Sequence, residues 1–262
     1  MNKVLLGGSV AIVMLAGAGA AMAADLPART GPVSAPVLYS APPVFSWTGF
    51  YLGVNAGYSV NDSKATTIGT PSFVDLDNTV PGSLSVGKDG FIGGGQIGYN
   101  QQFSGAIVGV EADIQYVDGK EGSVFTPAFA GISTSASSGL EYLGTVRARV
   151  GFLTAPRLMV YGTGGLAYGN PNNAASVTTT AGGVWGSNKD DTRFGYTVGG
   201  GVEYALTNNL TAKVEYLYYD LGKRTVTAQP LNAAATALTG LAYQARFENN
   251  GHIVRGGVNY KF

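Results

Sequence analysis

Residues 193–219 read RFGYTVGGGVEYALTNNLTAKVEYLYY, and apolar and polar side chains alternate along both halves of this stretch. In the first half, Phe194 and Tyr204 fall on one side of the alternation and Glu203 falls on the other. A period of two with one apolar face is typical of a β-strand. The polar residues 207–209 (TNN) separate the halves, so the stretch predicts two strands joined by a tight turn.

The same alternation recurs along the chain, in segments that reach ten residues or more. Strands of globular proteins usually have about five or six residues, so the length favours strands that cross something thicker than an ordinary core. We predict eight strands, at about residues 50–60, 90–102, 106–117, 140–153, 158–168, 193–206, 210–219 and 252–262.

One face of these segments is apolar, with Leu140 and Val146 as examples from the fourth, and the other face carries the charges. An eight-stranded barrel has an interior that side chains can fill. Buried charges are costly unless they are paired. We therefore predict a network of ion pairs in the lumen, made of Glu111, Asp113, Glu141, Arg147, Arg149, Glu203, Lys213, Glu215, Arg255 and Lys261. A narrow polar pathway and a catalytic carboxylate pair remain alternative interpretations.

Aromatic residues gather at both ends of the apolar face, and the connections between strands alternate in length. Short turns join segments at one end, and long stretches rich in Ser, Thr, Asn, Gly and Ala join them at the other. The aromatic residues at the long-loop end are Tyr58, Phe91, Tyr116, Tyr142, Tyr168, Phe194 and Tyr218, and those at the turn end are Phe50, Tyr99, Phe152, Tyr204 and Tyr260. Two such belts match the two lipid–water interfaces.

These features together predict an all-β fold. We expect an eight-stranded antiparallel up-and-down transmembrane β-barrel, with short periplasmic turns and four long external loops. An even number of strands places both chain ends on the side of the short turns. Closing the sheet also satisfies the backbone groups that lipid cannot.

Composition argues against most kinds of enzyme. The 262 residues include no cysteine and one histidine, so disulfides, thiolate zinc sites and thiol catalysis are excluded. Sixteen basic residues balance sixteen acidic ones, and nucleic-acid binding therefore has no support. Residues 93–98 fit a Gly-x-Gly-x-x-Gly dinucleotide fingerprint, but no helix pattern follows them. We expect these glycines to allow close approach of neighbouring groups, and we expect neither a metal nor a cofactor.

The first 46 residues differ from the rest. Lys3 precedes an apolar run that ends in Ala-Met-Ala at residues 21–23, which predicts a cleaved signal peptide over residues 1–23. A retained membrane helix is the alternative, because the run approaches the length of a membrane span. Residues 24–46 are rich in proline and are interpreted as an extended periplasmic tether. The barrel domain is assigned to residues 47–262.

Several motifs carry a family resemblance. They are WTGFYLGVNAGY (47–58), GGGQIGYNQQ (93–102), GVEADIQ (109–115), TVRARVGF (145–152), YGTGGLAYG (161–169) and RGGVNYKF (255–262). With residues 195–222, they resemble the small outer-membrane β-barrel family of alpha-proteobacteria, which comprises porin-family and immunogenic surface proteins, some of them described as hemin-binding. One departure is Tyr196, where the family often has Trp.

The resemblance implies a place in the outer membrane and a set of partners. The barrel assembly machinery would recognise a C-terminal signal, which we assign to Val258, Tyr260 and Phe262. The other expected partners are outer-membrane lipid and external ligands at the loops, with no nucleic acid.

We predict a structural surface protein with a salt-bridge-filled lumen, which contributes to envelope integrity and surface interactions and is not an enzyme. A small passive pore for low-mass solutes is one alternative. A binder of external heme, with His252 at the outer rim as a ligand, is another.

Overall fold

The computed structural model describes residues 45–67, 83–86, 89–118, 120–125, 132–237 and 243–262. The predicted signal peptide at 1–23 lies outside the described residues, as does all of the predicted tether except residues 45 and 46. Both assignments therefore stay predictions. In the part of the chain that is described, no helix is long and apolar enough to cross a membrane.

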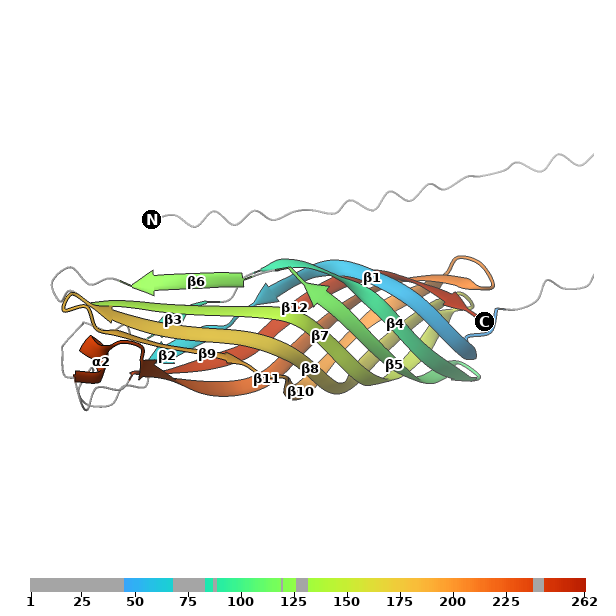
Figure 1. The fold of residues 1–262 in the computed structure, drawn as a ribbon. Helices are drawn as coiled ribbons and strands as arrows, with labels where there is room; N and C mark the ends of the chain where they lie inside the picture. Colours follow the sequence, from blue (N-terminus) through green and yellow to red (C-terminus); the bar gives the residue numbers. More distant parts are fainter. Residues whose placement is uncertain (1–44, 68–82, 87–88, 119, 126–131, 238–242) are drawn as a thin grey trace, which may run out of the picture. The chain divides into compact units, whose positions relative to one another are not determined.

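Eight of the described strands form a closed antiparallel ring. They are β1 (Gly49–Asn61), β4 (Gly90–Phe103), β5 (Ala106–Val117), β7 (Ile132–Ala155), β8 (Leu158–Thr179), β10 (Arg193–Ala205), β11 (Leu210–Pro230) and β12 (Tyr243–Lys261). Each pairs with the next in this order, and β12 pairs with β1 to close the ring (Figure 1). The predicted eight-stranded antiparallel barrel is confirmed.

Tight turns connect the strands at one end of the barrel. β4 and β5 are joined by residues 104–105, β7 and β8 by residues 156–157, and β10 and β11 by residues 206–209. Ser104 has a φ of 55°, a left-handed conformation that a two-residue hairpin turn requires. The described parts of the long connections lie at the other end, as the sequence predicts.

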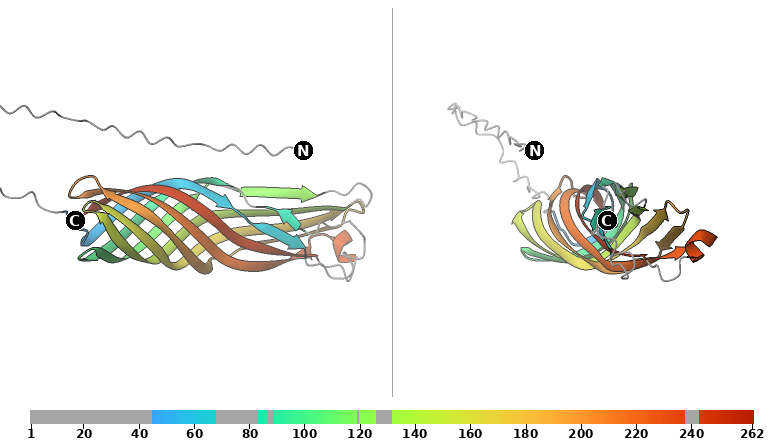
Figure 2. Two further views of the ribbon diagram at one scale, coloured as in Figure 1. Left: turned by 180° about the vertical axis from the view of Figure 1, so that it is seen from behind. Right: turned by 90° about the vertical axis from the view of Figure 1, so that its left-hand side faces the viewer.

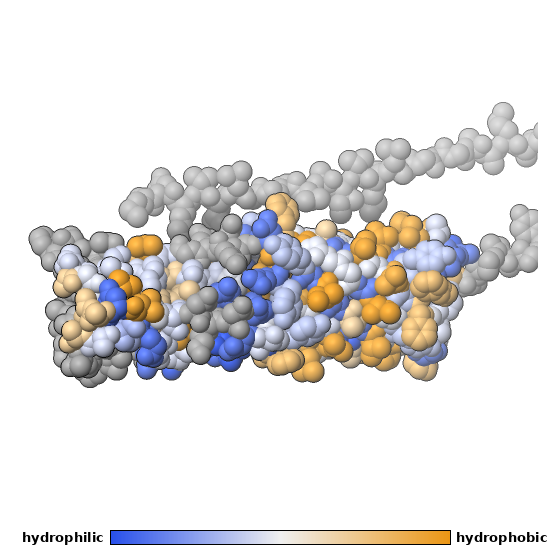
Figure 3. Space-filling view, in the orientation of Figure 1, coloured by the Kyte–Doolittle hydropathy of each residue, from blue (hydrophilic) through white to orange (hydrophobic). Residues whose placement is uncertain are grey.

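The predicted apolar face points outward along the barrel strands. Its members include Leu52, Val110 and Val214, all exposed on the outer wall. The predicted aromatic belts lie on this face as well, and Phe91 and Phe194 are among the most exposed side chains of the long-loop belt. In Figure 3 the apolar side chains gather over the barrel half of the molecule. This surface suits contact with lipid rather than water.

The long connections contain strands where the sequence predicts irregular loops. β2 (Lys64–Thr67), β3 (Ser83–Ser85), β6 (Lys120–Phe125) and β9 (Val184–Asp190) all lie in them, together with the short helix α2 (Ala233–Ala237). Strands β7, β8, β11 and β12 run on beyond the barrel and pair with these shorter strands. We call these shorter strands, helix α2 and the continuing ends of β7, β8, β11 and β12 the extension. Helix α2 marks it in Figure 1, and Figure 2 shows it from two further sides.

The extension repeats the strand order of the barrel and has its own apolar core. Its strands follow each other as β6, β7, β8, β9, β11, β12, β2 and β3 among the residues described. The Ser123 hydroxyl of β6 donates to the Ser85 carbonyl of β3 at 2.5 Å, which brings the two ends of this series together. The core consists of Ala65, Val86, Ala136, Ala175, Val177, Trp185, Val226, Ala228, Ala235, Ala245 and Phe247.

Two irregularities mark the passage from barrel to extension. The register of β11 against β12 shifts between Asp220 and Lys223, where Gly222 has a φ of 79° that favours glycine. The register of β7 against β8 shifts between Leu140 and Leu143. The assignment of Leu140 to the outward face is therefore wrong: the shift breaks the period of two, and its side chain is buried inside.

Trp185→Ala tests whether the extension has an apolar core that is separate from the barrel interior. Trp185 is almost fully buried in that core, so its truncation is expected to destabilise the extension by about 3–5 kcal/mol. Limited proteolysis should cut the extension faster, while the barrel keeps its compact mobility on unheated gels. Val124→Ala, at an exposed position of β6, is the matched control and should change neither readout. Equal protease resistance of the two variants would contradict this account.

Candidate functional site in the barrel interior

A layer of ionised side chains fills the middle of the barrel. Within the described residues, the buried charged side chains comprise four acids and four bases, which we call the charged layer: Glu111, Asp113, Glu203, Glu215, Arg147, Arg149, Lys213 and Arg255. They come from strands β5, β7, β10, β11 and β12. Their formal charges cancel, which is a condition for burying so many ions together.

Arg147 of β7 is at the centre of this layer. Its Nη1 donates to Glu215 Oε1 at 2.9 Å, and its Nη2 donates to Asp113 Oδ2 at 2.8 Å and also to Glu111. Its Nε donates to the hydroxyl of Thr145 at 2.9 Å. One guanidinium thus holds three carboxylates from two strands, β5 and β11, through charge-assisted hydrogen bonds.

Arg149 extends the layer toward the short-turn end with the help of two tyrosines. Its Nη2 donates to Glu203 Oε2 at 2.7 Å, and its Nη1 contacts Glu111 Oε2 at 3.2 Å. Tyr51 accepts from Arg149 Nη1 at 2.7 Å and donates its hydroxyl proton to Glu111 at 2.7 Å. The ring of Tyr161 lies 4.0 Å from the guanidinium carbon, a cation–π contact.

Arg255 and Lys213 complete the pairing. Arg255 Nη2 lies 2.6 Å from Glu215 Oε2 and 3.0 Å from Asp113 Oδ2. Lys213 Nζ donates to both carboxylate oxygens of Glu111 at 2.8 Å. Every carboxylate of the charged layer therefore has a cation within hydrogen-bonding distance.

Neutral polar side chains continue the network around the inside of the wall. Glu203 Oε1 accepts from Thr211 at 2.5 Å and from Asn259 Nδ2 at 2.8 Å. Gln96 Nε2 donates to Asn259 Oδ1 at 2.5 Å, and Asn55 Nδ2 donates to Gln96 Oε1 at 3.0 Å. This chain of amides links β10 through β12 to β4 and β1, which contribute no buried charge of their own among the residues described.

Two apolar layers enclose the charged layer. Along β5, the inward side chains run from Ile107 through Glu111 and Asp113 to Val117. The turn-end apolar layer, at the short turns, consists of Phe45, Trp47, Ile107, Met159, Tyr161 and Ala205. The outer apolar layer consists of Ile92, Val117, Leu140, Leu143, Ala167, Leu217, Tyr219, Leu221 and Ile253. The ion-pair network predicted from the sequence includes neither apolar layer.

Inward glycines make room for the large side chains of the network. A Cβ atom at Gly98 would overlap the phenol of Tyr51, and one at Gly57 would overlap the backbone and side chain of Arg255. Gly98 therefore has the close approach that the sequence predicts for the 93–98 stretch. Gly93 and Gly95 lie on the outward side, where a Cβ would meet nothing closer than 3.8 Å.

Glu141 and Lys261 do not belong to the buried charged layer. Lys261 lies at the mouth, where its Nζ donates to the Thr48 carbonyl at 3.2 Å, because the last strand ends at this level. Glu141 is half-buried and lies between Leu140 and Leu143, at the register shift beside the outer apolar layer. The prediction included both residues in the network because it counted every second residue of each strand as inward-facing.

His252 lies on the outward face near the outer belt. Its Nδ1 is 2.6 Å from the Tyr216 hydroxyl, and its Nε2 is 3.4 Å from Asp62 Oδ2. Its ring also lies 5.2 Å from that of Tyr218. The residue is thus engaged by neighbours on the protein wall. No group of three His, Cys, Asp or Glu side chains that could hold a metal ion is found in the described ranges.

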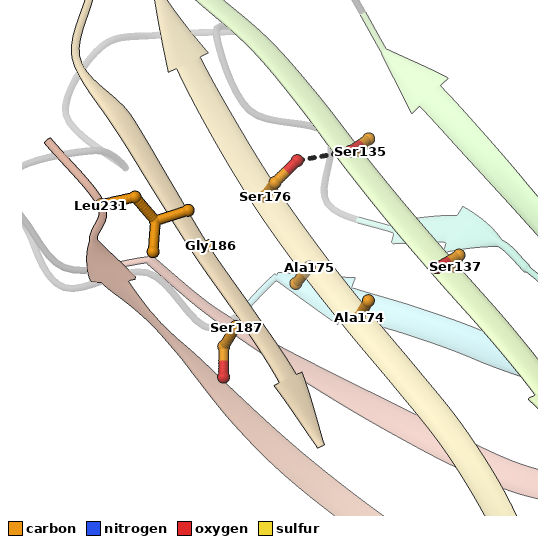
Figure 4. A pocket seen from close by; sticks show the side chains of 8 residues that line it. All are labelled: Ser135, Ser137, Ala174, Ala175, Ser176, Gly186, Ser187 and Leu231. Carbon is orange, nitrogen blue, oxygen red and sulfur yellow. Dashed lines mark hydrogen bonds between the residues drawn. The ribbon is translucent and has the colours of Figure 1, made fainter. Parts of the chain in front are cut away.

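A groove of about 400 Å³ lies on the outer surface of the extension (Figure 4). Small side chains of β7, β8 and β9 line it, including Ser135, Ser176 and Ser187, with Leu231 at one side. The hydroxyls of Ser135 and Ser176 bond to each other at 2.6 Å. No ionised side chain lines the groove. Among the described residues, the buried charged side chains lie in the barrel interior, which we therefore take as the candidate site.

Arg147→Ala tests the contribution of the charged layer to stability. The substitution leaves the layer with an unbalanced negative charge, and the expected loss of unfolding free energy is about 3–5 kcal/mol. Urea unfolding in lipid vesicles, followed by tryptophan fluorescence, measures this loss. Arg157→Ala is the control, because Arg157 bonds only to the exposed turn at 206–208 and to Ala205 among the described groups. A loss no larger than that of the control would refute the role assigned to Arg147.

Comparison with known proteins identifies the family. Residues 10–262 match the family described as outer membrane protein beta-barrel domain. The chain is 43% identical over 256 residues to the 31 kDa outer-membrane immunogenic protein of Brucella melitensis, covering 95% of this chain and 99% of the relative. It is 36% identical over 186 residues to the 22 kDa outer membrane protein of Rhizobium leguminosarum, covering 68% of this chain and 66% of that protein.

Among solved structures, the crystal structure of the outer membrane protein OprG from Pseudomonas aeruginosa is similar over 82% of this chain and 96% of its own. The sequence identity is 13% and the TM-score is 0.45. The family match and the Brucella relative confirm the resemblance found in the sequence. The chain belongs to the outer membrane protein beta-barrel domain family and is an outer-membrane protein.

Proposed function

We propose that this protein is a closed, non-conducting barrel that strengthens the outer membrane and presents the extension at the cell surface. The observation that carries the proposal is the charged layer, whose eight described members are paired and buried between two apolar layers. A permeable lumen would need water and mobile counter-ions at this level.

The pairing opposes passage of solutes. An ion that crossed the barrel would have to separate contacts such as Arg147–Glu215, at 2.9 Å, and leave charges unpaired in a poorly hydrated interior. Breaking a buried ion pair costs about 3–5 kcal/mol. The apolar layers add a second barrier, since Trp47 at one end and Leu143 at the other are almost fully buried.

The outward face supports outer-membrane lipid as the main partner. Apolar side chains cover the wall, and the belt residues Phe50 and Phe152 are exposed at the short-turn end. Tyr260 and Phe262 are exposed at the end of the chain, with ring centroids 5.3 Å apart. We extend the proposal to these residues, with Val258, as the part that the barrel assembly machinery recognises during insertion.

The extension supports a role in surface interactions. Its own apolar core gives it a defined form, so it offers a stable surface rather than flexible loops. The Brucella relative is named an immunogenic protein, and we propose that the extension is the corresponding surface-exposed part here.

We further propose that the protein is not an enzyme. The carboxylates of the charged layer are held by guanidinium and ammonium groups, which leaves them ill-suited to exchange protons with a substrate. His252 lies on the outer wall with its Nδ1 bonded to Tyr216. The chain has no cysteine to act as a nucleophile.

Single-channel recording in planar bilayers tests the closed barrel. We expect no discrete current steps from the purified protein at physiological voltage, because ion pairs and apolar layers occupy the interior. Folding is verified in the same sample by its compact mobility on unheated gels. Reproducible steps from folded protein, absent from an unfolded control, would refute the proposal and favour a small passive pore.

A further inference from the structure

The chain enters the barrel before its first strand begins. Phe45 is 6% exposed and Trp47 is 1% exposed, although both precede β1. Their rings meet edge to face, with centroids 4.9 Å apart. Residues 45–48 therefore occupy the mouth of the barrel at the short-turn end, and we call this segment the stopper.

The stopper is held by inward side chains from several strands. Its apolar neighbours are Ile107 of β5, Met159 and Tyr161 of β8 and Ala205 of β10. These residues lie apart in the sequence and come together only across the width of the barrel. The apolar contact surface thus depends on the assembled ring.

Polar contacts fix the stopper to two more strands. The Trp47 amide donates to Gln102 Oε1 of β4 at 2.9 Å, and the Gln102 amide donates to the Thr48 hydroxyl at 3.0 Å. Lys261 of β12 donates to the Thr48 carbonyl at 3.2 Å and lies 5.5 Å from the centre of the Phe45 ring. Lys261 reaches this position only where β12 pairs with β1, with Tyr51 opposite it.

We propose that the stopper docks after the ring of strands has closed and then holds the closed barrel against unfolding. The receiving surface includes residues of β4, β5, β8, β10 and β12, so it is incomplete until the last strand has paired with the first. Contacts that form after the transition state slow unfolding and leave the folding rate unchanged. The stopper thus slows unfolding of the barrel, and it lies in the chain directly before β1, the strand with which β12 pairs to close the ring.

The double variant Phe45→Ala/Trp47→Ala tests this role of the stopper. Urea-unfolded protein is diluted into phosphatidylcholine vesicles, and closure is followed by gel mobility without heating. We expect the folding rate to stay within about twofold of the parent and the unfolding rate in urea to rise at least about tenfold. The matched control is Phe50→Ala/Phe152→Ala, which removes two aromatic rings at the same end that face outward.

Two results would overturn the proposal. The first is a folding rate of the double variant that falls by the same factor by which its unfolding rate rises. This result would place the stopper in the folding nucleus. The second is an unfolding rate of the double variant equal to that of the parent or of the control variant. This result would show that the stopper does not stabilise the closed barrel against unfolding.

A second measurement does not depend on removing the stopper. The chain has two tryptophans, so Trp185→Phe leaves Trp47 as the fluorescent probe. Acrylamide quenching during folding should show that Trp47 loses contact with water together with gel-detected closure or after it. Protection of Trp47 before closure would contradict the proposed order.

Discussion

The cost of burying ionised groups inside a lipid-embedded wall is the constraint on which this structure depends. A carboxylate or guanidinium taken out of water loses several kcal/mol of solvation, and only close opposite charges restore it. Arg147 shows the solution, since one side chain bonds carboxylates of both β5 and β11. The described charged layer is neutral in sum, so it joins five strands of the ring without a net buried charge.

The surrounding features follow from this layer. Its side chains are large, and glycines such as Gly98 leave the space that they need beside Tyr51. The apolar layers on both sides exclude water, which strengthens every ion pair between them. The stopper forms part of one apolar layer, through Trp47. Beyond the barrel, β7, β8, β11 and β12 continue into the extension, where the interior is filled by alanines and Trp185 instead of charged side chains.

The sequence allowed the barrel to be predicted but not the extension. Alternation defined β5 at residues 106–117 because a lipid-facing strand needs an unbroken apolar face. The β7 residues 132–139 are mostly serine and alanine, whose weak contrast in polarity hides the same period. The inward positions of Glu111 and Arg147 followed from the two-residue period of a strand alone. The buried position of Trp47 did not, because Trp47 precedes the first strand.

The most direct test of the account is the exchange of the Arg147 side chain with water. Its donors are bonded to protein groups and its side chain is fully buried. In folded protein transferred to D₂O, NMR should detect the Arg147 Nε–H signal for hours, while the Nε–H of exposed Arg246 exchanges before the first spectrum. Exchange of Arg147 as fast as that of Arg246 would show that water reaches the charged layer, and it would contradict a closed barrel.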